Sequence, residues 1–564
     1  MEDVLAELDA RLAEAPAGKR IERVDVVALD VFEDRDPAPK LLNVLHVTTR
    51  ERVIRRELLF DVGDPYRPKR IDESERNLRS RRQLSLVLIV PVEGSAPDRV
   101  RVVVITKDVW SLRLNWGVEY GRGALTRFVL QPSEENLFGT HATVAGLFEL
   151  LPDVYSVGGL FSHARLGGTW LRSLINANLV FNRRTGENEG SFGSLYYGQP
   201  LYSLRTEWAY EVTASWRYLI SRSFTGDVQR VFDPRPPGRR DGPCGDLCIP
   251  LEYRTDELYG SYLLTRSYGR LDKFDLSVGA EAQRRAYRTI DLQDRDLSAR
   301  AAFIRQEVPV SDTRISPVFQ VRAHSTRFTS VLNLTTLGLQ EDYRTGHDLY
   351  LRVYPAARSF GSTRDLFGTY AAIAYTFPVS DGLFRTVVSN TIEFAGPNRT
   401  DAEASAALFL ATPSLGFGRF IYSAYLFHQY ENYLNERLEL GGDTRLRGYA
   451  PSAFRGKDLL SSNFELRTRP LSLWSVQVGA AAFYDVGDAF DGFEDLALKQ
   501  GGGAGIRVLL PQLERTVFRV DWGVPLTPEP AWPGAMFLSF AQAFNVPAPL
   551  PPSQAAVIAP VPLY

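Results

Sequence analysis

The chain is 564 residues long and nearly neutral, with 65 Lys and Arg against 67 Asp and Glu. This balance offers no basic surface for nucleic acid, and the length exceeds that of one ordinary small domain. No run of about 18 uninterrupted apolar residues occurs, which argues against membrane-spanning helices. Aromatic residues and glycine are abundant (25 Tyr, 32 Phe, 8 Trp and 44 Gly), and this composition favours strands and turns over a helical core.

The first 110 residues predict a short helix and linker (1–18) followed by a small α+β domain (19–110). The start of the chain is acidic and lacks an apolar core segment, so it is not a secretory signal peptide. Hydrophobic periodicity then predicts, in order, a strand, two helices and two strands, over residues 21–29, 51–60, 69–81, 84–92 and 100–109. Two helices on one face of a three-stranded sheet would bury their apolar residues together.

After residue 110 the hydrophobic period changes to two. Leu112, Leu114 and Trp116 fall on one face of the first such segment, and Arg113 and Asn115 on the other. Roughly 20 strand candidates of this kind lie between 111 and 545, with lengths suited to crossing a bilayer at a tilt. An open sheet edge in hydrocarbon would leave backbone groups unpaired at several kcal/mol each. The region 111–545 is therefore expected to be a transmembrane antiparallel β-barrel, and the fold class mainly β.

Two cysteines, Cys244 and Cys248, lie in a proline-rich loop of this region. They allow one local disulfide in an oxidising compartment, or two free thiols. A metal site would need further ligands, and none of the six histidines lies nearby in sequence. We therefore expect no metal.

The most informative segment is 440–449, LGGDTRLRGY, which leads into SNFELR at 462–467. The motifs YDVG (484–487), GIR (505–507) and VDWG (520–523) follow in order. This succession resembles the last strands of the BamA/TamA outer-membrane protein assembly superfamily. The order of elements in 19–110 is similar to a POTRA domain of that superfamily, and only one copy fits. The resemblance implies a barrel of sixteen strands, with the excess candidates assigned to long extracellular hairpins.

The same resemblance implies that the loop tip folds into the lumen and that Arg447 pairs with Asp485. Glu465 is a second acceptor, and Gly448, Tyr449 and Gly487 complete this candidate lock. Alternation along 477–485 independently places Asp485 on the polar face, and an arginine fork fits a carboxylate with two hydrogen bonds. The alternative is that Arg447 is a solvated loop residue and Asp485 one more lumenal charge.

The resemblance also implies a lateral seam between the first strand (about 111–120) and the last (about 535–544). The candidate seam residues are Leu112, Leu114, Trp116, Phe540 and Phe544. An incoming client strand would add to the exposed edge. The expected partners are unfolded outer-membrane or secreted client proteins, membrane lipid and accessory subunits bound through the POTRA domain. The expected location is the bacterial outer membrane, with the POTRA domain and the Pro-rich tail (546–564) in the periplasm and the signal peptide absent from the given chain.

Two other functions remain open, a two-partner-type secretion pore for one exported protein and a passive barrel that serves as an anchor or channel. An enzyme is not expected, because neither HExxH nor GxSxG occurs. The glycine run 501–505 precedes a strand and not a phosphate-binding helix, so no cofactor is expected either.

Overall fold

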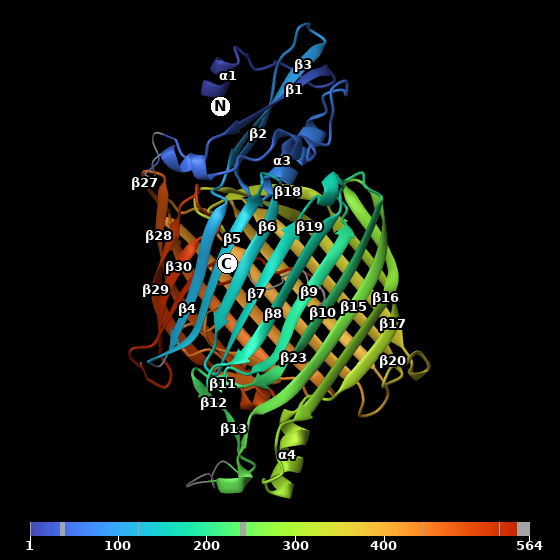
Figure 1. Ribbon diagram of the computed structural model, residues 1–564, viewed down its shortest axis with the longest axis vertical. Coiled ribbons are helices and arrows are strands. Elements are labelled where there is room, and N and C mark those ends of the chain that lie inside the picture. Colours follow the sequence, from blue (N-terminus) through green and yellow to red (C-terminus); the bar gives the residue numbers. More distant parts are fainter. Residues whose placement is uncertain are drawn as a thin grey trace.

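The computed structural model shows two bodies, a small N-terminal domain and a large β-barrel (Figure 1). It describes residues 2–33, 36, 40–121, 123–236, 244–443, 445–529 and 531–549. Within these ranges, no helix has the length and apolar character needed to cross a membrane. Most of the predicted Pro-rich tail, residues 550–564, lies outside the described residues.

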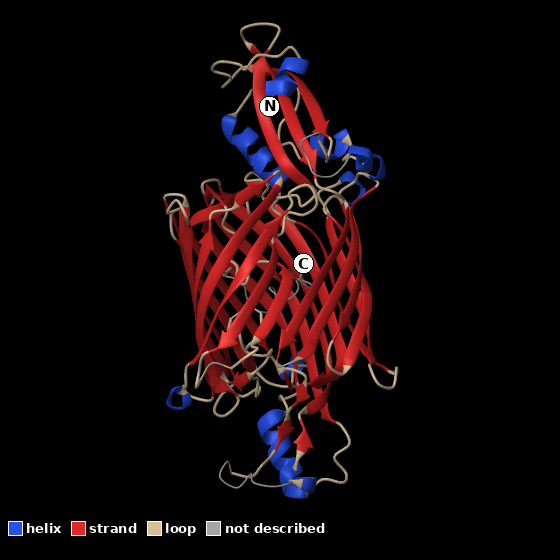
Figure 2. Cartoon of the chain, turned by 90° about the vertical axis from the view of Figure 1, so that its left-hand side faces the viewer, coloured by secondary structure: helices blue, strands red, loops and turns tan. Residues whose placement is uncertain are grey.

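The N-terminal domain is a three-stranded sheet with helices packed against it (Figure 2). The strand order is β1-β3-β2, in which β1 is parallel to β3 and β2 is antiparallel to it. The elements are α1 (Glu2–Glu7), β1 (Arg20–Leu29), the 3-10 helix η1 (Lys40–Leu45), α2 (Glu51–Arg55), α3 (Pro68–Arg79), β2 (Leu84–Glu93) and β3 (Arg99–Asp108).

The central strand β3 supplies both faces of this small core. Val102 and Val104 pack with Ile54 of α2 and Leu78 of α3 on one face. The next residues along β3 point the other way, as strand geometry requires, and Val103 packs with Val4 and Leu5 of α1. The sheet is therefore covered on both sides, and α1 belongs to this domain.

The barrel is closed and contains 20 antiparallel strands within the described ranges. In chain order its strand segments are β4 (Leu112–Gly121), β5 (Ala124–Leu137), β6 (Ala142–Leu150), β7 (Val154–His163), β8 (Arg172–Asn182), β9 (Asn188–Gln199), β10 (Trp208–Arg222), β15 (Glu252–Gly269), β16 (Asp272–Thr289), β17 (Asp312–Ser325), β18 (Arg327–Leu332), β19 (Gln340–Ala356), β20 (Leu366–Val379), β21 (Gly382–Phe394), β22 (Asp401–Ala411), β23 (Gly418–Asn432), β26 (Asp458–Thr468), β27 (Leu471–Leu473), β28 (Val476–Phe490), β29 (Lys499–Leu509), β30 (Phe518–Pro525) and β31 (Ala535–Phe540). The segments β17 and β18 are parts of one strand because both pair with β19, and β26 and β27 both pair with β28.

The prediction of a closed, mainly β barrel is confirmed, but the prediction of sixteen strands is wrong. Alternation alone predicts roughly 20 strands. The resemblance implies sixteen, and so it assigns the candidates beyond sixteen to extracellular hairpins. The long strands β15 and β16, with 18 residues each, show why that reassignment fails. Each pairs with a neighbour on both sides, so neither can leave the wall without opening the barrel.

Shorter elements lie at the two ends of the barrel, which we call proximal (facing the N-terminal domain) and distal. The 3-10 helix η2 (Leu166–Gly168) is proximal. The distal elements are β11 (Phe224–Thr225), β12 (Val228–Gln229), β13 (Val231–Phe232), η4 (Gly245–Leu247), β14 (Ile249–Pro250), α4 (Leu297–Glu307), η5 (Arg358–Phe360), β24 (Leu438–Leu440), β25 (Phe454–Gly456) and η6 (Phe493–Asp495).

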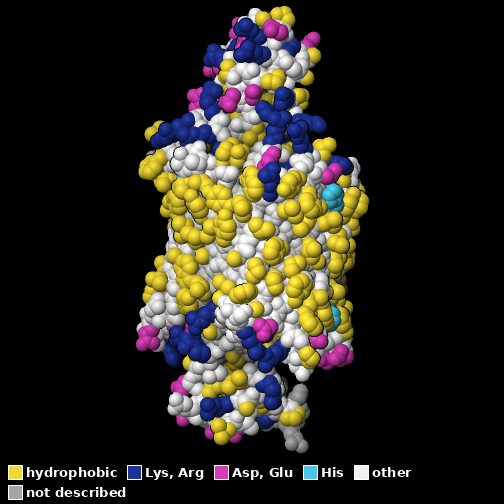
Figure 3. All heavy atoms as spheres, turned by 90° about the vertical axis from the view of Figure 1, so that its right-hand side faces the viewer, with side chains coloured by type: hydrophobic (Ala, Val, Ile, Leu, Met, Phe, Trp, Pro, Cys, Tyr) yellow, Lys and Arg dark blue, Asp and Glu magenta, His cyan; other side chains and the backbone are white. Residues whose placement is uncertain are grey.

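The barrel wall is apolar outside and polar inside. On β16, Phe274 and Val278 are 43% and 49% exposed, whereas Asp275 and Ser277 between them are 7% and 3% exposed. Apolar side chains form a broad band over the barrel, and charged side chains gather above and below it (Figure 3). The two-residue period in the sequence therefore corresponds to apolar side chains that face outward and polar side chains that face the lumen.

The hairpin of β18 and β19 crosses the proximal opening beneath the N-terminal domain (Figure 1). Its tip, residues 333–339, reaches the far wall, where Arg467 Nη1 of β26 donates to the Leu334 carbonyl at 2.6 Å. From the other side, Arg79 of α3 forms a 3.0 Å ion pair with Asp342. The hairpin is thus held between the domain and the barrel.

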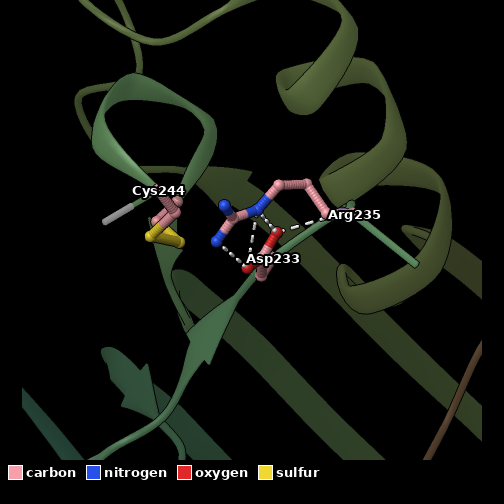
Figure 4. Close-up of a disulfide and its surroundings, with 4 residues drawn as sticks. Asp233, Arg235 and Cys244 are labelled. Carbon is pink, nitrogen blue, oxygen red and sulfur yellow. Dashed lines mark hydrogen bonds and ion pairs between the residues drawn. A yellow bond between two sulfur atoms is a disulfide. The ribbon is translucent and has the colours of Figure 1, made fainter. Parts of the chain in front are cut away.

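At the distal end, Cys244 and Cys248 form a disulfide with a Cα–Cα distance of 5.5 Å. Close by, Arg235 donates to the Asp233 carboxylate through Nη2 at 2.7 Å and Nε at 3.0 Å (Figure 4). Of the three arrangements considered for these cysteines, the structure has the disulfide, so neither sulfur is a free thiolate for a metal. The hairpin of β13 and β14 packs against α4, where Phe232 contacts Phe303.

The N-terminal domain is docked on the proximal rim through buried polar contacts. Glu57 is 1% exposed and binds Arg81 of its own domain at 2.8 Å and Arg165 of the barrel at 3.0 Å. His141, in the turn between β5 and β6, lies with Nε2 3.1 Å from Thr49 Oγ1. Burial alone would raise the pKa of Glu57, but the two arginines outweigh it and hold that pKa below its usual value. Burial lowers the pKa of His141 to about 4, against opposition from Asp108.

Acidification is expected to weaken this docking. An exposed histidine takes up a proton near pH 6.5, whereas docked His141 stays neutral down to about pH 4. The undocked state therefore binds more protons between these two pH values. As the pH falls across the full range, the undocked state is stabilised relative to the docked state by on the order of 3 kcal/mol. The lowered pKa of Glu57 means that its ionised carboxylate stabilises the docked state above the usual pKa of a glutamate. This stabilisation is lost only when the pH falls through the lowered pKa, and the loss then adds to the effect of His141.

Spin labels at positions 98 and 205, one on each body, would report the docking distance between pH 7.5 and 4.5. His141→Gln should remove most of the pH dependence. His428→Gln, at the distal end, is the matched control and should leave it intact. A pH dependence that persists unchanged in His141→Gln would contradict this account.

Candidate functional site: a lumenal charge cluster and a short seam

The loop between β24 and β25 descends from the distal end into the barrel lumen. The two short strands pair at its base, and the tip carries Arg447, whose side chain is fully buried (0% exposed). Gly448 adopts φ +104°, a backbone conformation that residues with a Cβ rarely adopt. The sharp turn therefore depends on the glycine that follows the arginine.

Arg447 binds three carboxylates from three strands of the wall. Its Nε and Nη2 donate to Asp485 at 2.8 and 3.0 Å, and its backbone N–H donates to the same side chain at 3.0 Å. Its Nη1 donates to Glu465 at 2.5 Å and to Asp521 at 3.1 Å. The guanidinium also lies 3.7 Å from the centroid of the Phe483 ring. Every side of the cation is occupied, so the desolvation cost of burial is offset by charge-assisted bonds.

Two of the three acids, Glu465 and Asp521, are in turn shared with neighbouring arginines of the wall. Arg507 pairs with Asp521 at 2.5 Å, Arg519 with Asp521 at 2.8 Å and Arg467 with Glu465 at 2.6 Å. Arg519 also pairs with Asp443 of the loop. We call these eight residues the lumenal charge cluster: Asp443, Arg447, Glu465, Arg467, Asp485, Arg507, Arg519 and Asp521. With four arginines and four carboxylates, the cluster is electrically balanced.

Glycines in β29 and β30 make room for the loop tip. A Cβ built on Gly501 would lie 2.2 Å from the Arg447 carbonyl oxygen. A Cβ built on Gly523 would lie 2.7 Å from the Gly448 nitrogen. Gly501 and Gly523 therefore form the floor on which the tip rests.

The remaining predicted lock residues lie at the edge of this arrangement. Tyr449 Oη lies 3.0 and 3.1 Å from the carbonyl oxygens of Gln500 and Thr527. Gly487 of β28 lies against Leu440 at the base of the loop, where an added Cβ would come within 3.2 Å of that side chain. Thus the structure brings together Arg447, Gly448, Tyr449, Glu465, Asp485 and Gly487.

The seam between the first and last barrel strands is short. Only four residue pairs join β31 to β4, from Ala535↔Gly121 to Leu538↔Val118. On its other edge β4 pairs with β5 from Leu112 onward. In the described part of the chain, residues 112–117 therefore have a strand partner on one edge only. This unpaired stretch lies in the proximal half of the wall, next to the N-terminal domain.

Four of the five predicted seam residues lie at this edge. Leu112 and Leu114 are 62% and 60% exposed on the outer face. The Trp116 ring lies 6.4 Å from that of Phe540, which also packs with Val129 and Leu147 of the neighbouring strands. Phe540 therefore covers the gap that the missing strand pairs leave.

The structure places Phe544 elsewhere. The last strand ends at Phe540 and not near 544, because the chain turns inward there and residues 541–549 enter the lumen. The Phe544 ring centroid lies 5.7 Å from the guanidinium carbons of both Arg447 and Arg467. The prediction of a seam role for Phe544 is therefore wrong, whereas a periplasmic position for the Pro-rich tail stays a prediction.

Sequence reasoning missed five of the eight residues of the charge cluster: Asp443, Arg467, Arg507, Arg519 and Asp521. Arg507 and Asp521 belong to the GIR and VDWG motifs, whose order along the chain supports the resemblance but does not predict a role for either residue. Their alternation signal was available, because Val520 and Trp522 flank Asp521 as outward residues and place it on the lumenal face. The contribution of Asp443 carries no such signal, since it lies in the loop.

No protein-family model matches the chain, and no curated protein sequence matches it. Among solved structures, BamA from Haemophilus ducreyi lacking POTRA domains 1–3 is 11% identical, with 94% of this chain and 88% of that chain covered and a TM-score of 0.34. CdiB from Escherichia coli is 13% identical, with 94% and 80% covered and a TM-score of 0.43. The ferric-catecholate import receptor Fiu from K12 E. coli is 11% identical, with 80% and 85% covered and a TM-score of 0.33. At these scores the similarities carry no argument about the role of this protein.

Removal of Arg447 should destabilise the barrel strongly. Arg447→Ala leaves three buried carboxylates without their shared partner, a loss of about 3–5 kcal/mol for a broken buried pair. Asp485→Ala should also destabilise, and the double variant should lose less than the sum of the two. The temperature at which the folded barrel unfolds on a heat-modifiability gel measures each effect. Arg445→Ala is the control, since Arg445 lies in the same loop but contacts uncharged partners: it donates to Ser461 at 3.3 Å and lies 3.9 Å from the centroid of the Tyr425 ring. Strict additivity would show that Arg447 and Asp485 do not interact.

A methyl group on the glycine floor should displace the loop tip. Gly501→Ala places a Cβ at the Arg447 carbonyl and should lower the unfolding temperature on the same gel. Gly260→Ala, on β15, is the matched control because its nearest neighbour to an added Cβ is 4.0 Å away. Equal stability of the two variants would mean that the tip does not rest on β29.

Proposed function

We propose that this protein is an outer-membrane β-barrel that assists the insertion, assembly or translocation of client proteins through the seam between β4 and β31. The observation that carries the proposal is the unpaired edge of β4 over residues 112–117. A backbone edge without a partner is costly in hydrocarbon, so a wall that keeps one has a reason to do so. The apolar band on the barrel exterior is the surface that membrane lipid would cover.

The first step is addition of a client strand to the β4 edge. The edge offers backbone donors and acceptors at the spacing of a strand, and it starts where the N-terminal domain meets the barrel. That domain, which we propose to be a single POTRA domain, would hold the client beforehand or bind accessory periplasmic subunits. No catalytic step and no nucleotide are needed, because folding of the client supplies the free energy.

The charge cluster has a complementary role in this proposal. It ties the loop to β26, β28 and β30, so the C-terminal part of the wall stays rigid next to a weak seam. Opening would then break four residue pairs at β31–β4 and the packing of Phe540, while the rest of the ladder stays intact.

Two observations weigh against the other functions. A dedicated two-partner secretion pore would use its N-terminal helix as a plug, but α1 packs on the sheet of the N-terminal domain through Val4 and Leu5. A passive open channel would need a free lumen, but the loop, the β18–β19 hairpin and residues 541–549 occupy part of it. Depletion of the protein should therefore affect many outer-membrane proteins. An effect on one secreted partner would favour the pore, and an absence of any effect the passive barrel.

A crosslink across the seam should abolish the activity. Val118 and Leu538 are direct partners in the seam, so Val118→Cys with Leu538→Cys should form a disulfide that prevents opening. Client assembly should stop under oxidising conditions and return on reduction. The control pair is Leu264→Cys with Val278→Cys, on the adjacent strands β15 and β16, which should have no effect. Full activity of the locked protein would overturn lateral opening.

A further inference from the structure

The C-terminal segment 541–549 lies in the lumen in an irregular conformation. It is held by three polar contacts near its start. Arg519 Nε donates to the Ala541 carbonyl at 3.0 Å, Arg507 Nε donates to Gln542 Oε1 at 3.2 Å, and Gln542 Nε2 donates to the Thr335 carbonyl at 3.4 Å. Two of these donors belong to the lumenal charge cluster, so the segment runs between that cluster and the β18–β19 hairpin.

Beyond Gln542, two side chains of the segment enter an apolar patch inside the barrel. Phe544 and Val546 pack against a group contributed by the hairpin and the opposite wall: Val331, Leu334, Leu383, Phe409, Ala411 and Ile421. Barrel interiors are ordinarily polar, and a patch of this kind would be hydrated if the segment left. The patch therefore accepts apolar side chains spaced two residues apart in the chain.

The segment is held less firmly than the loop that carries Arg447. No residue of 541–549 belongs to a strand, and Asn545, between the two apolar anchors, is exposed. Phe544 and Val546 are only partly buried, whereas Arg447 is fully enclosed by three ion pairs. A segment outside the strand ladder, whose two apolar anchors are only partly buried, opens at lower cost than the strands of the wall.

The site has free space beside it. A cavity of about 340 Å³ borders Gln542, Arg467, Arg507 and Leu337. Across the hairpin, a cavity of about 720 Å³ faces α3 of the N-terminal domain. A polypeptide that arrives from the domain would meet the larger cavity first and the tip of the hairpin next.

We infer that residues 541–549 occupy, within their own chain, a lumenal site for a peptide with an aromatic residue two positions before an aliphatic one. The inference rests on the proposed function, since it names the kind of client segment that the barrel receives. Such a segment takes the place of Phe544 and Val546 on the apolar patch, and the protein's own segment keeps the patch dry when no client is bound.

The test is binding of a synthetic labelled peptide, AQAFNVPAP, to the purified full-length protein. In Phe544→Ser/Val546→Ser the internal segment no longer competes, so the peptide should bind at least about tenfold more tightly than to the unaltered protein. Asn545→Ser is the matched control and should bind as the unaltered protein does. A peptide with serine at both anchor positions should not bind. Equal binding by the double variant and the control, or by both peptides, would overturn the inference.

A second measurement uses the unaltered chain and covers the case in which the double variant does not fold. A saturating amount of the peptide should increase hydrogen exchange of residues 541–549 several-fold, with no change in residues 441–449 of the loop. Unchanged exchange in 541–549 at saturation would mean a fixed structural plug and would overturn the inference. Neither readout depends on client assembly, so a failure of the seam-locking experiment and a failure of this one are distinguishable.

Discussion

The closed ladder of backbone hydrogen bonds is the constraint on which the rest of this structure depends. A sheet that faces hydrocarbon cannot leave donors and acceptors unpaired, so its strands must form a ring and alternate apolar outside with polar inside. The ring has 20 strands, and this width leaves a lumen too large to be filled by wall side chains alone. The loop with Arg447, the β18–β19 hairpin and residues 541–549 occupy part of that space.

Ion pairs hold the interior of the barrel together, whereas the exterior is an apolar surface. Arg447 joins Glu465, Asp485 and Asp521 on β26, β28 and β30, and Glu465 and Asp521 are also bound by arginines of the wall. A balanced network of this kind is stable only when each member is satisfied. It therefore fixes the loop at one position and ties it to β26, β28 and β30.

The strands that the cluster connects lie next to the seam, where the wall is weakest. The seam has four residue pairs, and its gap is covered by Phe540, the last residue of the last strand. The next residues turn into the lumen and reach both the charge cluster and the hairpin. The seam, the cluster and the proximal hairpin are thus linked through one short stretch of chain, and the N-terminal domain is docked on the same rim through Glu57 and His141.

Local sequence patterns determined much of this architecture. Alternation at Leu112–Trp116 and at Phe274–Val278 specified which side chains face outward, because the direction of a side chain in a strand follows from its parity. The same parity placed Asp485 in the lumen, and periodicity in residues 19–110 gave the order β1, α2, α3, β2, β3.

Other features needed the tertiary structure, since they depend on partners distant in the chain. Parity cannot say whether a strand joins the ring or a hairpin, and so the choice between sixteen and 20 strands was decided by the pairing of β15 and β16 with their neighbours. Nor could it show that β31 stops at Phe540 or that Phe544 turns inward, because the patch that receives Phe544 is built from residues 331–421, more than a hundred positions earlier.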